Sequence, residues 1–268
     1  MQFAVNYSLA LENLLLSHQV DVDLLKCPEW LGVIHAAQRL RPVYVHFDIG
    51  VGNGQIAALD YDALRSLLNQ TKTPHLNCHL AGNSNLEAES TQDRSKQVAL
   101  WANDLALLHS HLPEFPIVAE NLPVSLHDKG TYIGADPALI NEALLSTETD
   151  LLFDLSHARI SCAALGMELA EYVDKLPMQR MRELHITGLR AYNGSLSDHF
   201  ELTDADWQAA QWAQQQIAVG AWREPEIVAL EYGGVGDVFG WRTRPEVLLT
   251  QIPRLQAMFS SHARAELS

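Results

Sequence analysis

The stretch Pro116-Ile117-Val118-Ala119-Glu120-Asn121 is a short apolar run that ends on a carboxylate and an amide. Seven further runs have the same form, at residues 3–7, 22–26, 43–47, 75–80, 151–154, 183–187 and 227–232. At or near their ends the eight runs carry Asn6, Lys26, His46, His79, Glu120, Asp154, His185 and Glu231. Short runs rich in Val, Ile and Leu are typical of strands that are buried on both faces of a parallel sheet.

Helical patterns separate these runs, so strand and helix alternate along the whole chain. The helices are expected over residues 28–40, 61–68, 90–111, 137–145, 167–176, 204–219 and 245–259. Such alternation favours a parallel sheet, and eight strands favour a closed (β/α)8 barrel, the TIM barrel, over an open doubly wound sheet. We find no internal repeat and no linker, so we predict one α/β TIM-barrel domain over residues 1–268. In that fold the carboxyl ends of the strands build the active site.

The composition limits the classes of partner. Hydrophobic residues make up 47% of the 268 residues, which predicts a packed globular protein. The formal net charge of −15 repels a phosphate backbone and no run of Lys or Arg offsets it, so we expect no nucleic-acid partner. Three cysteines without CxxC spacing argue against a disulfide framework. The start of the chain does not read as a signal peptide and no apolar stretch is long enough for a bilayer, so we expect a cytoplasmic protein without membrane contact.

Two short motifs bring potential ligands close together. Strand alternation puts His75, Asn77 and His79 on one face, where polar side chains are costly unless they bind something. Asp154 ends a strand and His157 follows three residues later, so both can reach one centre. The simpler interpretations are a helix cap for Asp154 and hydrogen-bonded core residues for the histidines.

Metal binding accounts best for the whole set of polar residues. The candidate ligands, six at strand ends and three in the loops beyond them, are His46, His79, Glu120, Asp154, His157, His185, Asp198, His199 and Glu231. This set exceeds the need of one tetrahedral zinc ion, and mixed imidazole and carboxylate ligands suit Fe, Zn or Mn. We therefore expect two or three divalent ions, with Asn6 and Lys26 outside the ligand set and with Asn121 and Asn6 orienting ligands. The alternative is a polar barrel interior without metal.

The order of these residues resembles the xylose isomerase-like TIM-barrel superfamily, which includes sugar isomerases and epimerases and endonuclease IV-type nucleases. Within it, Glu120-Asn121-Leu122-Pro123 and residues 152–157 and 183–188 look most like the multinuclear non-haem iron-dependent oxidases. These methanobactin oxidase-like enzymes modify cysteines in ribosomal peptides. Two positions depart from them: His157 stands where Asn is usual, and the adjacent Asp198-His199 replaces a spaced Asp-x-His. By resemblance, the nine candidates carry over as metal ligands.

Four functions are open, and each makes its own demand on the site. An oxidase, with Fe as its metal, would act on a peptide or a small thiol and would need a peptide-docking surface or a partner protein. A sugar or sugar-phosphate isomerase or epimerase would use one divalent ion, with Glu120 and Glu231 moving protons. Glycine-rich loops at residues 50–54 and 233–234 are its candidate phosphate or hydroxyl sites. A nuclease-type phosphodiesterase would use three zinc ions, and a non-catalytic barrel would only bind a partner.

We favour a metal-dependent enzyme of the oxidase type, with a peptide or small molecule as its substrate. Glu120, Glu231 and His185 are the residues that we expect to be catalytic. Iron is the expected metal, with zinc and manganese as alternatives.

Overall fold

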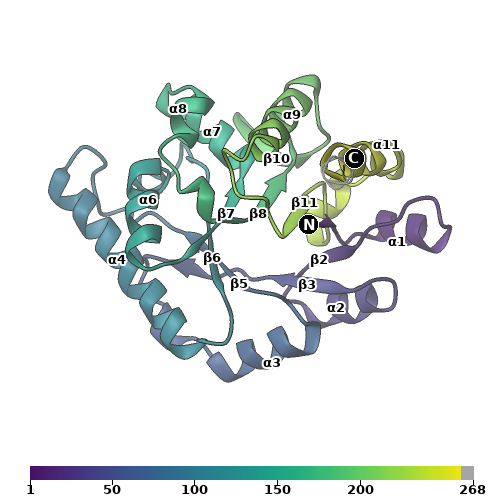
Figure 1. Cartoon of the computed structure of the whole chain (residues 1–268), viewed down its shortest axis with the longest axis horizontal. Helices are drawn as coiled ribbons and strands as arrows, with labels where there is room; N and C mark the ends of the chain where they lie inside the picture. Colours follow the sequence, from purple (N-terminus) through teal and green to yellow (C-terminus); the bar gives the residue numbers. More distant parts are fainter. Residues whose placement is uncertain (261–268) are drawn as a thin grey trace.

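The structure is a computed structural model, and it describes residues 1–260. One curled parallel sheet contains β1 (Gln2–Asn6), β2 (Leu24–Pro28), β3 (Val43–His46), β4 (Gly50–Val51), β5 (Leu76–Leu80), β6 (Ile117–Glu120), β7 (Asp150–Asp154), β8 (Met181–Ile186) and β11 (Ile227–Leu230). The strand order is β3-β2-β1-β11-β8-β7-β6-β5-β4. The two edge strands, β3 and β4, are consecutive in the sequence, so they are two halves of one interrupted strand. The predicted (β/α)8 barrel is confirmed, and its strands lie near the expected positions (Figure 1).

Helices surround the sheet and cover its outer face (Figure 1). They are α1 (Leu9–Leu16), α2 (Leu31–Gln38), α3 (Tyr61–Thr71), α4 (Thr91–His111), α5 (Gly130–Gly134), α6 (Pro137–Ser146), α7 (Leu155–Leu165), α8 (Leu169–Val173), α9 (Asp204–Ala218), α10 (Gly236–Phe239) and α11 (Pro245–Ser260), with short turns η1 (Ile56–Ala58), η2 (Met178–Arg180) and η3 (Gly240–Arg242). No helix within residues 1–260 combines the length and the apolarity that crossing a membrane requires.

Side-chain alternation divides the interior into two apolar regions. Phe3 and Val5 of β1 join the main core between the strands and the helices. Ala4, on the opposite face, belongs to a separate small cluster with Leu24, Tyr44, Ile227 and Ala229. This second cluster fills the barrel interior toward the start of the strands, so the inward polar residues lie above it at the carboxyl ends.

Asn77 of β5 closes the barrel at the break between β3 and β4. Its Oδ1 accepts from the backbone N of Phe47 at 2.7 Å, and its Nδ2 donates to the carbonyl of Phe47 at 3.0 Å. Beyond the break, the backbone N of His79 donates to the carbonyl of Ile49 at 2.7 Å. Because buried backbone groups need partners, the amide of Asn77 substitutes for the missing part of the strand ladder. The inward position of Asn77 was predicted, but this role was not.

The segment after β7 differs from the prediction. We expected a helix over residues 167–176, but the main helix, α7, begins directly after Asp154, and only the short α8 lies in the predicted range. The buried face of α7 includes Ser156, His157 and Ser161, which interrupt the apolar period. The spacing of apolar residues therefore did not indicate this helix, because its buried face is partly polar.

A β-hairpin replaces the polar loop that was predicted after β8. Strands β9 (Gly188–Tyr192) and β10 (Ser195–Phe200) pair in antiparallel fashion around Asn193-Gly194. Both turn residues have positive φ, 50° and 81°, as a type I′ turn requires. Asn-Gly is a strong hairpin signal, so this element was visible in the sequence. Asp198 and His199 consequently lie on a strand rather than in a loop.

The glycine-rich segment after β3 serves the barrel itself. Gly50 and Val51 form β4, and Gly52 packs so closely that a Cβ there would stand 2.7 Å from the Ala81 carbonyl oxygen and from the Trp101 ring. Gly52 also has a φ of 99°, which favours glycine. The close packing and the positive φ explain why a glycine stands at position 52, and neither explanation involves a bound phosphate.

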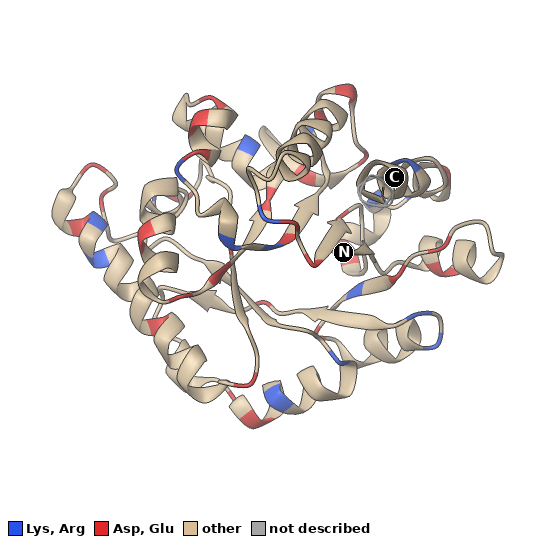
Figure 2. Ribbon diagram, in the orientation of Figure 1, with Lys and Arg blue, Asp and Glu red and all other residues tan. Residues whose placement is uncertain are grey.

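Acidic residues are distributed all around the barrel, and Lys and Arg are scattered among them (Figure 2). Several of these basic side chains pair with a nearby carboxylate, such as Arg65 with Asp62 and Glu114.

Candidate metal centre

A cleft of about 460 Å³ opens at the carboxyl ends of the barrel strands. Six of the nine predicted ligands line it: His46, His79, Glu120, His157, His199 and Glu231. Asp154 and His185 are fully buried next to them, and Asp198 contacts His157 at the side of the cleft. The barrel therefore gathers all nine side chains at one end, from seven different elements and the residue after β11.

The imidazoles of His46 and His79 and the carboxylate of Glu120 form the tightest group. His46 Nε2 lies 3.1 Å from His79 Nε2, and Glu120 Oε2 lies 3.4 and 3.3 Å from these nitrogens. Ligands about 2.0–2.1 Å from a tetrahedral ion stand about 3.3 Å apart, so these spacings match one shared ion. Among the described residues, Glu120 Oε2 is buried without a hydrogen-bond partner. A cation at this point would satisfy it.

Glu120, Asp154 and His185 form a second group, entirely inside the barrel. His185 Nδ1 lies 3.9 Å from Glu120 Oε1 and 3.8 Å from Asp154 Oδ2. Asp154 Oδ2 is likewise buried with no hydrogen-bond partner in the part of the chain described. Burial raises the pKa of Asp154, so a nearby cation would favour its ionised form. Both groups fit a divalent ion with N and O ligands, and Glu120 offers one oxygen to each.

Asn121 and Asp154 show how one carboxylate can cap a helix and still face the site. Asn121 Oδ1 accepts from the backbone N of Asp154 at 2.9 Å, and Asn121 Nδ2 donates to the Asp154 carbonyl at 3.0 Å. Asp154 Oδ1 then accepts from the backbone N of His157 at 2.7 Å and caps α7. Oδ2 is left for the second group, so the cap and the ligand interpretations of Asp154 are compatible.

His157 and Asp198 pair with each other beside the cleft. His157 Nε2 lies 2.9 Å from Asp198 Oδ2, and His157 Nδ1 donates to the Asn121 carbonyl at 2.9 Å. Burial acts to lower the pKa of His157, but the surrounding carboxylates, Asp154 first among them, raise it well above its ordinary value. Both ring nitrogens face acceptors, the Asn121 carbonyl and the Asp198 carboxylate, so these contacts favour the protonated ring. Within residues 1–260, neither His157 nor Asp198 belongs to the two ligand groups.

His199 lines the cleft outside the two ligand groups of the described chain. Its ring stacks on Phe239 with centroids 4.2 Å apart, and its Nδ1 donates to the Gly233 carbonyl at 3.2 Å. Asn6 Nδ2 donates to the same carbonyl at 3.2 Å. The φ of His199 is 57°, at the bulge of β10, so this irregular backbone turns the ring toward Phe239.

Lys26 is the residue near the centre whose role sequence reasoning missed. Its ammonium forms a buried ion pair with Glu231 and lies 3.3 Å from His185 Nε2. Burial lowers the pKa of Lys26 to about 8 despite the nearby carboxylates, so the side chain is still mainly charged at neutral pH. A signal existed, because a lysine facing a barrel interior is rarely buried unless it is paired.

Glu183 supports His185 from below, although the sequence assigned it no role. Glu183 Oε1 lies 2.7 Å from His185 Nε2 and accepts from the Tyr44 hydroxyl at 2.8 Å. Glu183 Oε2 lies 2.6 Å from His75 Nε2. Burial acts to raise the pKa of Glu183, but His185 and His75 hold it well below its ordinary value. A carboxylate on the far nitrogen of a histidine fixes the ring orientation and leaves the other nitrogen free for a metal.

The comparison with known families agrees with this geometry. A sequence model of the RiPP precursor modification enzymes MbnB/TglH/ChrH matches residues 26–221. The chain belongs to this family. The matched residues include Lys26 and every predicted ligand except Glu231, which lies just beyond them. No curated protein matches the sequence.

Solved structures support the same fold for this member of the MbnB/TglH/ChrH family. D-psicose 3-epimerase from Clostridium cellulolyticum H10 is 9% identical with a TM-score of 0.57, and the match covers 98% of this chain and 99% of the epimerase. A fusion of a xylose isomerase-like TIM barrel with 4-hydroxyphenylpyruvate dioxygenase is 14% identical with a TM-score of 0.55. That match covers 99% of this chain and 44% of the fusion. At these identities the likeness shows the fold alone.

The nearest family predicted from the sequence is confirmed, and the solved structures share the predicted barrel fold. Membership of the MbnB/TglH/ChrH family indicates an enzyme, and the clustered His, Glu and Asp side chains fit a metal-dependent one.

Proposed function

We propose that this protein is an iron-dependent oxidase that modifies a ribosomally made peptide at a centre of two metal ions. The observation that carries this proposal is Glu120, whose two oxygens face two separate groups of ligands. Two adjacent ions with a shared carboxylate suit a centre that binds substrate beside a redox metal. The family of RiPP precursor modification enzymes supports a peptide as the substrate class.

The residues divide naturally between two ions. His46, His79 and Glu120 would hold one ion, and Asp154 and His185 would hold the other together with the second oxygen of Glu120. Iron bound there would supply redox chemistry with dioxygen. Hydrogen bonds hold the ligands in place: Glu183 contacts the far nitrogen of His185, and Asn121 binds the backbone of Asp154.

His157 is placed to handle protons at the edge of the centre. It holds a proton at Nε2 against Asp198, and its Nδ1 lies 3.2 Å from Glu120 Oε1. Because the ring lines the cleft, His157 can exchange a proton with a substrate group bound there. Asp198 keeps the ring oriented during that exchange.

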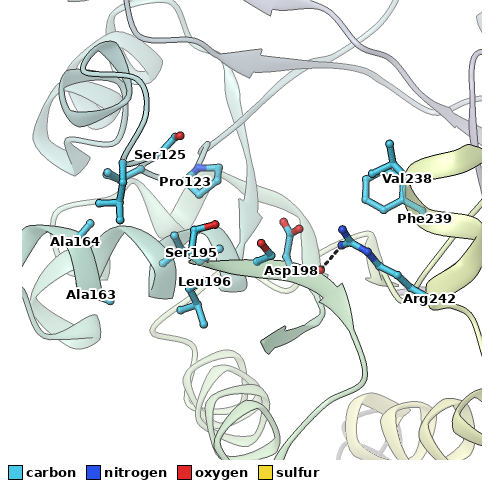
Figure 3. A pocket seen from close by; sticks show the side chains of 14 residues that line it. Pro123, Ser125, Ala163, Ala164, Ser195, Leu196, Asp198, Val238, Phe239 and Arg242 are labelled. Carbon is cyan, nitrogen blue, oxygen red and sulfur yellow. Dashed lines mark hydrogen bonds between the residues drawn. The ribbon is translucent and has the colours of Figure 1, made fainter. Parts of the chain in front are cut away.

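A second cleft of about 480 Å³ beside the centre supports a peptide rather than a small sugar as the substrate (Figure 3). Its walls come from the segment after β6, from α7, from β10 and from the segment around α10, and Phe239 lines both clefts. Arg242 donates to the Asp198 carbonyl at 2.8 Å and lies over the ring of Phe200, so it joins β10 to the α10 segment. Its mixed apolar and polar walls, next to the cleft of the centre, suit an extended chain.

Iron loading followed by a peptide assay tests the proposal. The protein would be loaded with Fe(II) without oxygen and then mixed with dioxygen and a set of cysteine-containing peptides. We expect a mass change at cysteine by tandem mass spectrometry that requires both iron and dioxygen. Glu120→Gln should abolish this change, whereas Glu142→Gln, an exposed change on α6, should leave it intact.

The same preparations distinguish the isomerase alternative. Manganese-loaded protein would be incubated with D-psicose and D-fructose, and the sugars would be separated by chromatography. Epimerisation of either sugar, together with unchanged peptides, would overturn the oxidase proposal.

A further inference from the structure

Arg242 is a cation on the wall of the second cleft. Its guanidinium forms no ion pair within residues 1–260, although Arg190 and Arg244 nearby both pair with Glu201. The chain carries a net charge of −15, so carboxylates are plentiful around the barrel. An arginine that lines a cleft and has no carboxylate partner is therefore a place where an acidic group of a ligand can bind.

The nitrogens of the Arg242 guanidinium still have unused donors. Nη1 donates to the Asp198 carbonyl at 2.8 Å, whereas Nε is buried without a hydrogen-bond partner in the described chain. Nη2 is not among the buried unpartnered atoms, and no acceptor within residues 1–260 contacts it, so it faces the cleft. Figure 3 shows the group pointing from the α10 side toward Asp198. A guanidinium has several N–H donors and no acceptor, so an anion is its natural partner.

Aromatic rings hold this guanidinium in one position. Its carbon lies 4.5 Å from the centre of the Phe200 ring and 5.3, 5.3 and 5.4 Å from the centres of Tyr192, Phe239 and Trp241. The rings attract the charge but supply no oxygen acceptor for its N–H groups. An arginine that is already held in place loses little side-chain entropy on binding, which favours recognition of a planar anion.

The carboxylate of Asp198 lines the same cleft but is engaged by another residue. Its Oδ2 lies 2.9 Å from His157 Nε2, and Arg242 contacts Asp198 only through the backbone carbonyl. These contacts also connect Arg242 to the metal centre, because His157 Nδ1 lies 3.2 Å from Glu120 Oε1. An acidic group bound to Arg242 would therefore lie beside the centre.

We propose that Arg242 binds a carboxylate of the substrate peptide, so that the second cleft selects peptides with an acidic group near the residue that is modified. The inference rests on the proposed function and adds to it a recognition point and a specificity. A C-terminal carboxylate and an Asp or Glu side chain both offer the two coplanar oxygens that a guanidinium binds.

Binding of three peptides that differ in one group tests this without any assay of activity. The probes are acetyl-Ala-Gly-Cys-Gly-Ala as the free acid, the same peptide as its amide, and that amide with Glu as the last residue. Calorimetric titration would use the protein as purified, without oxygen and at low salt. We expect an acidic peptide to bind about tenfold more tightly than the neutral amide, because hydrogen bonds to charged groups are the stronger ones. The tighter of the two acidic peptides identifies the source of the carboxylate.

Two variants assign the preference to Arg242. Arg242→Gln should bind all three peptides with the affinity of the neutral amide, because Gln keeps a donor for the Asp198 carbonyl but has no charge. Arg244→Gln is the matched control, since it removes the same charge from an exposed arginine paired with Glu201, and it should keep the preference. An unchanged preference in Arg242→Gln, or its loss in Arg244→Gln, would overturn the assignment. So would wild type that binds the three peptides equally or binds none, a result that needs no variant.

The iron-dependent peptide assay separates this inference from the proposed function. Oxidation of acidic and neutral peptides at equal efficiency would overturn the role of Arg242 and leave the oxidase proposal intact. Binding that depends on Arg242, without oxidation of any peptide, would support the carboxylate site and count against the oxidase.

Discussion

Glu183 and His185 lie two residues apart on the inner face of β8, and Glu183 Oε1 stands 2.7 Å from His185 Nε2. Both side chains are fully buried. This contact fixes which nitrogen of His185 faces Glu120 and Asp154, so a residue below the centre determines the geometry within it.

Glu183→Gln should weaken binding of the metal in the second group. Partners on the far nitrogen of a ligand histidine are typically worth about 10–100-fold in metal affinity, and we expect a loss in this range. Competition with a chelating dye would measure it. Glu171→Gln, exposed on α8, is the control. An unchanged affinity would show that His185 is oriented by other contacts or is not a ligand.

Glu120 and His46 should differ in the number of ions that their substitution removes. Glu120→Gln should lose both ions, because one carboxylate serves both groups, whereas His46→Ala should lose only the ion of the first group. Metal content after dialysis measures the difference, with the exposed His35→Ala as control. Equal losses in the two variants would argue against a shared carboxylate.

Asn77→Ala should destabilise the barrel, and it also removes an amide whose Nδ2 lies 3.3 Å from Nε2 of the predicted ligand His46. It leaves the backbone N and carbonyl of Phe47 buried without their partners. We expect the free energy of unfolding to fall by about 2–6 kcal/mol, because each of the two groups costs about 1–3 kcal/mol. Urea unfolding would measure the loss. Asn69→Ala, on the exposed side of α3, should change stability little, and a similar loss there would contradict this account.

The metal-free protein should show a pH dependence of stability that comes from His157. Its pKa is raised in the folded state by Asp154, Asp198 and Glu120, against the effect of burial. A raised pKa gives stability that is fully present below the unfolded value of 6.5 and is lost as pH rises through the folded pKa. Between pH 6 and about 8, wild type should therefore lose stability relative to His157→Gln. Thermal unfolding across this range tests it, and parallel curves for the two proteins would contradict it.

The barrel and most of the centre could be predicted because strand alternation fixes direction. Once residues 183–187 are taken as a strand, Glu183 and His185 must share a face, and parallel strands bring their carboxyl ends together. The eight strands and the gathering of the six strand-end side chains follow from this local rule, whereas His157, Asp198 and His199 reach the site from α7 and β10.

Other features depended on contacts between distant segments, which no local pattern encodes. The amide of Asn77 finds Phe47 only because a strand is interrupted 30 residues earlier. The ammonium of Lys26 finds Glu231 across 205 residues of sequence. The hairpin of β9 and β10 is different, because Asn193-Gly194 is a local sequence signal for it. The polar composition of the segment led us to predict a loop instead.

His46 ends β3 and His79 lies on β5, so the two imidazoles stand on opposite sides of the break in the third barrel strand. An ion held by both would link the two sides of this break, which the amide of Asn77 and the pairing of β4 with β5 otherwise close. Ligands that bind only the folded state stabilise it, and here that stabilisation falls on the least continuous part of the sheet. Binding of such an ion and closure of the barrel would therefore be coupled, and we expect the metal-free protein to unfold locally at this break first.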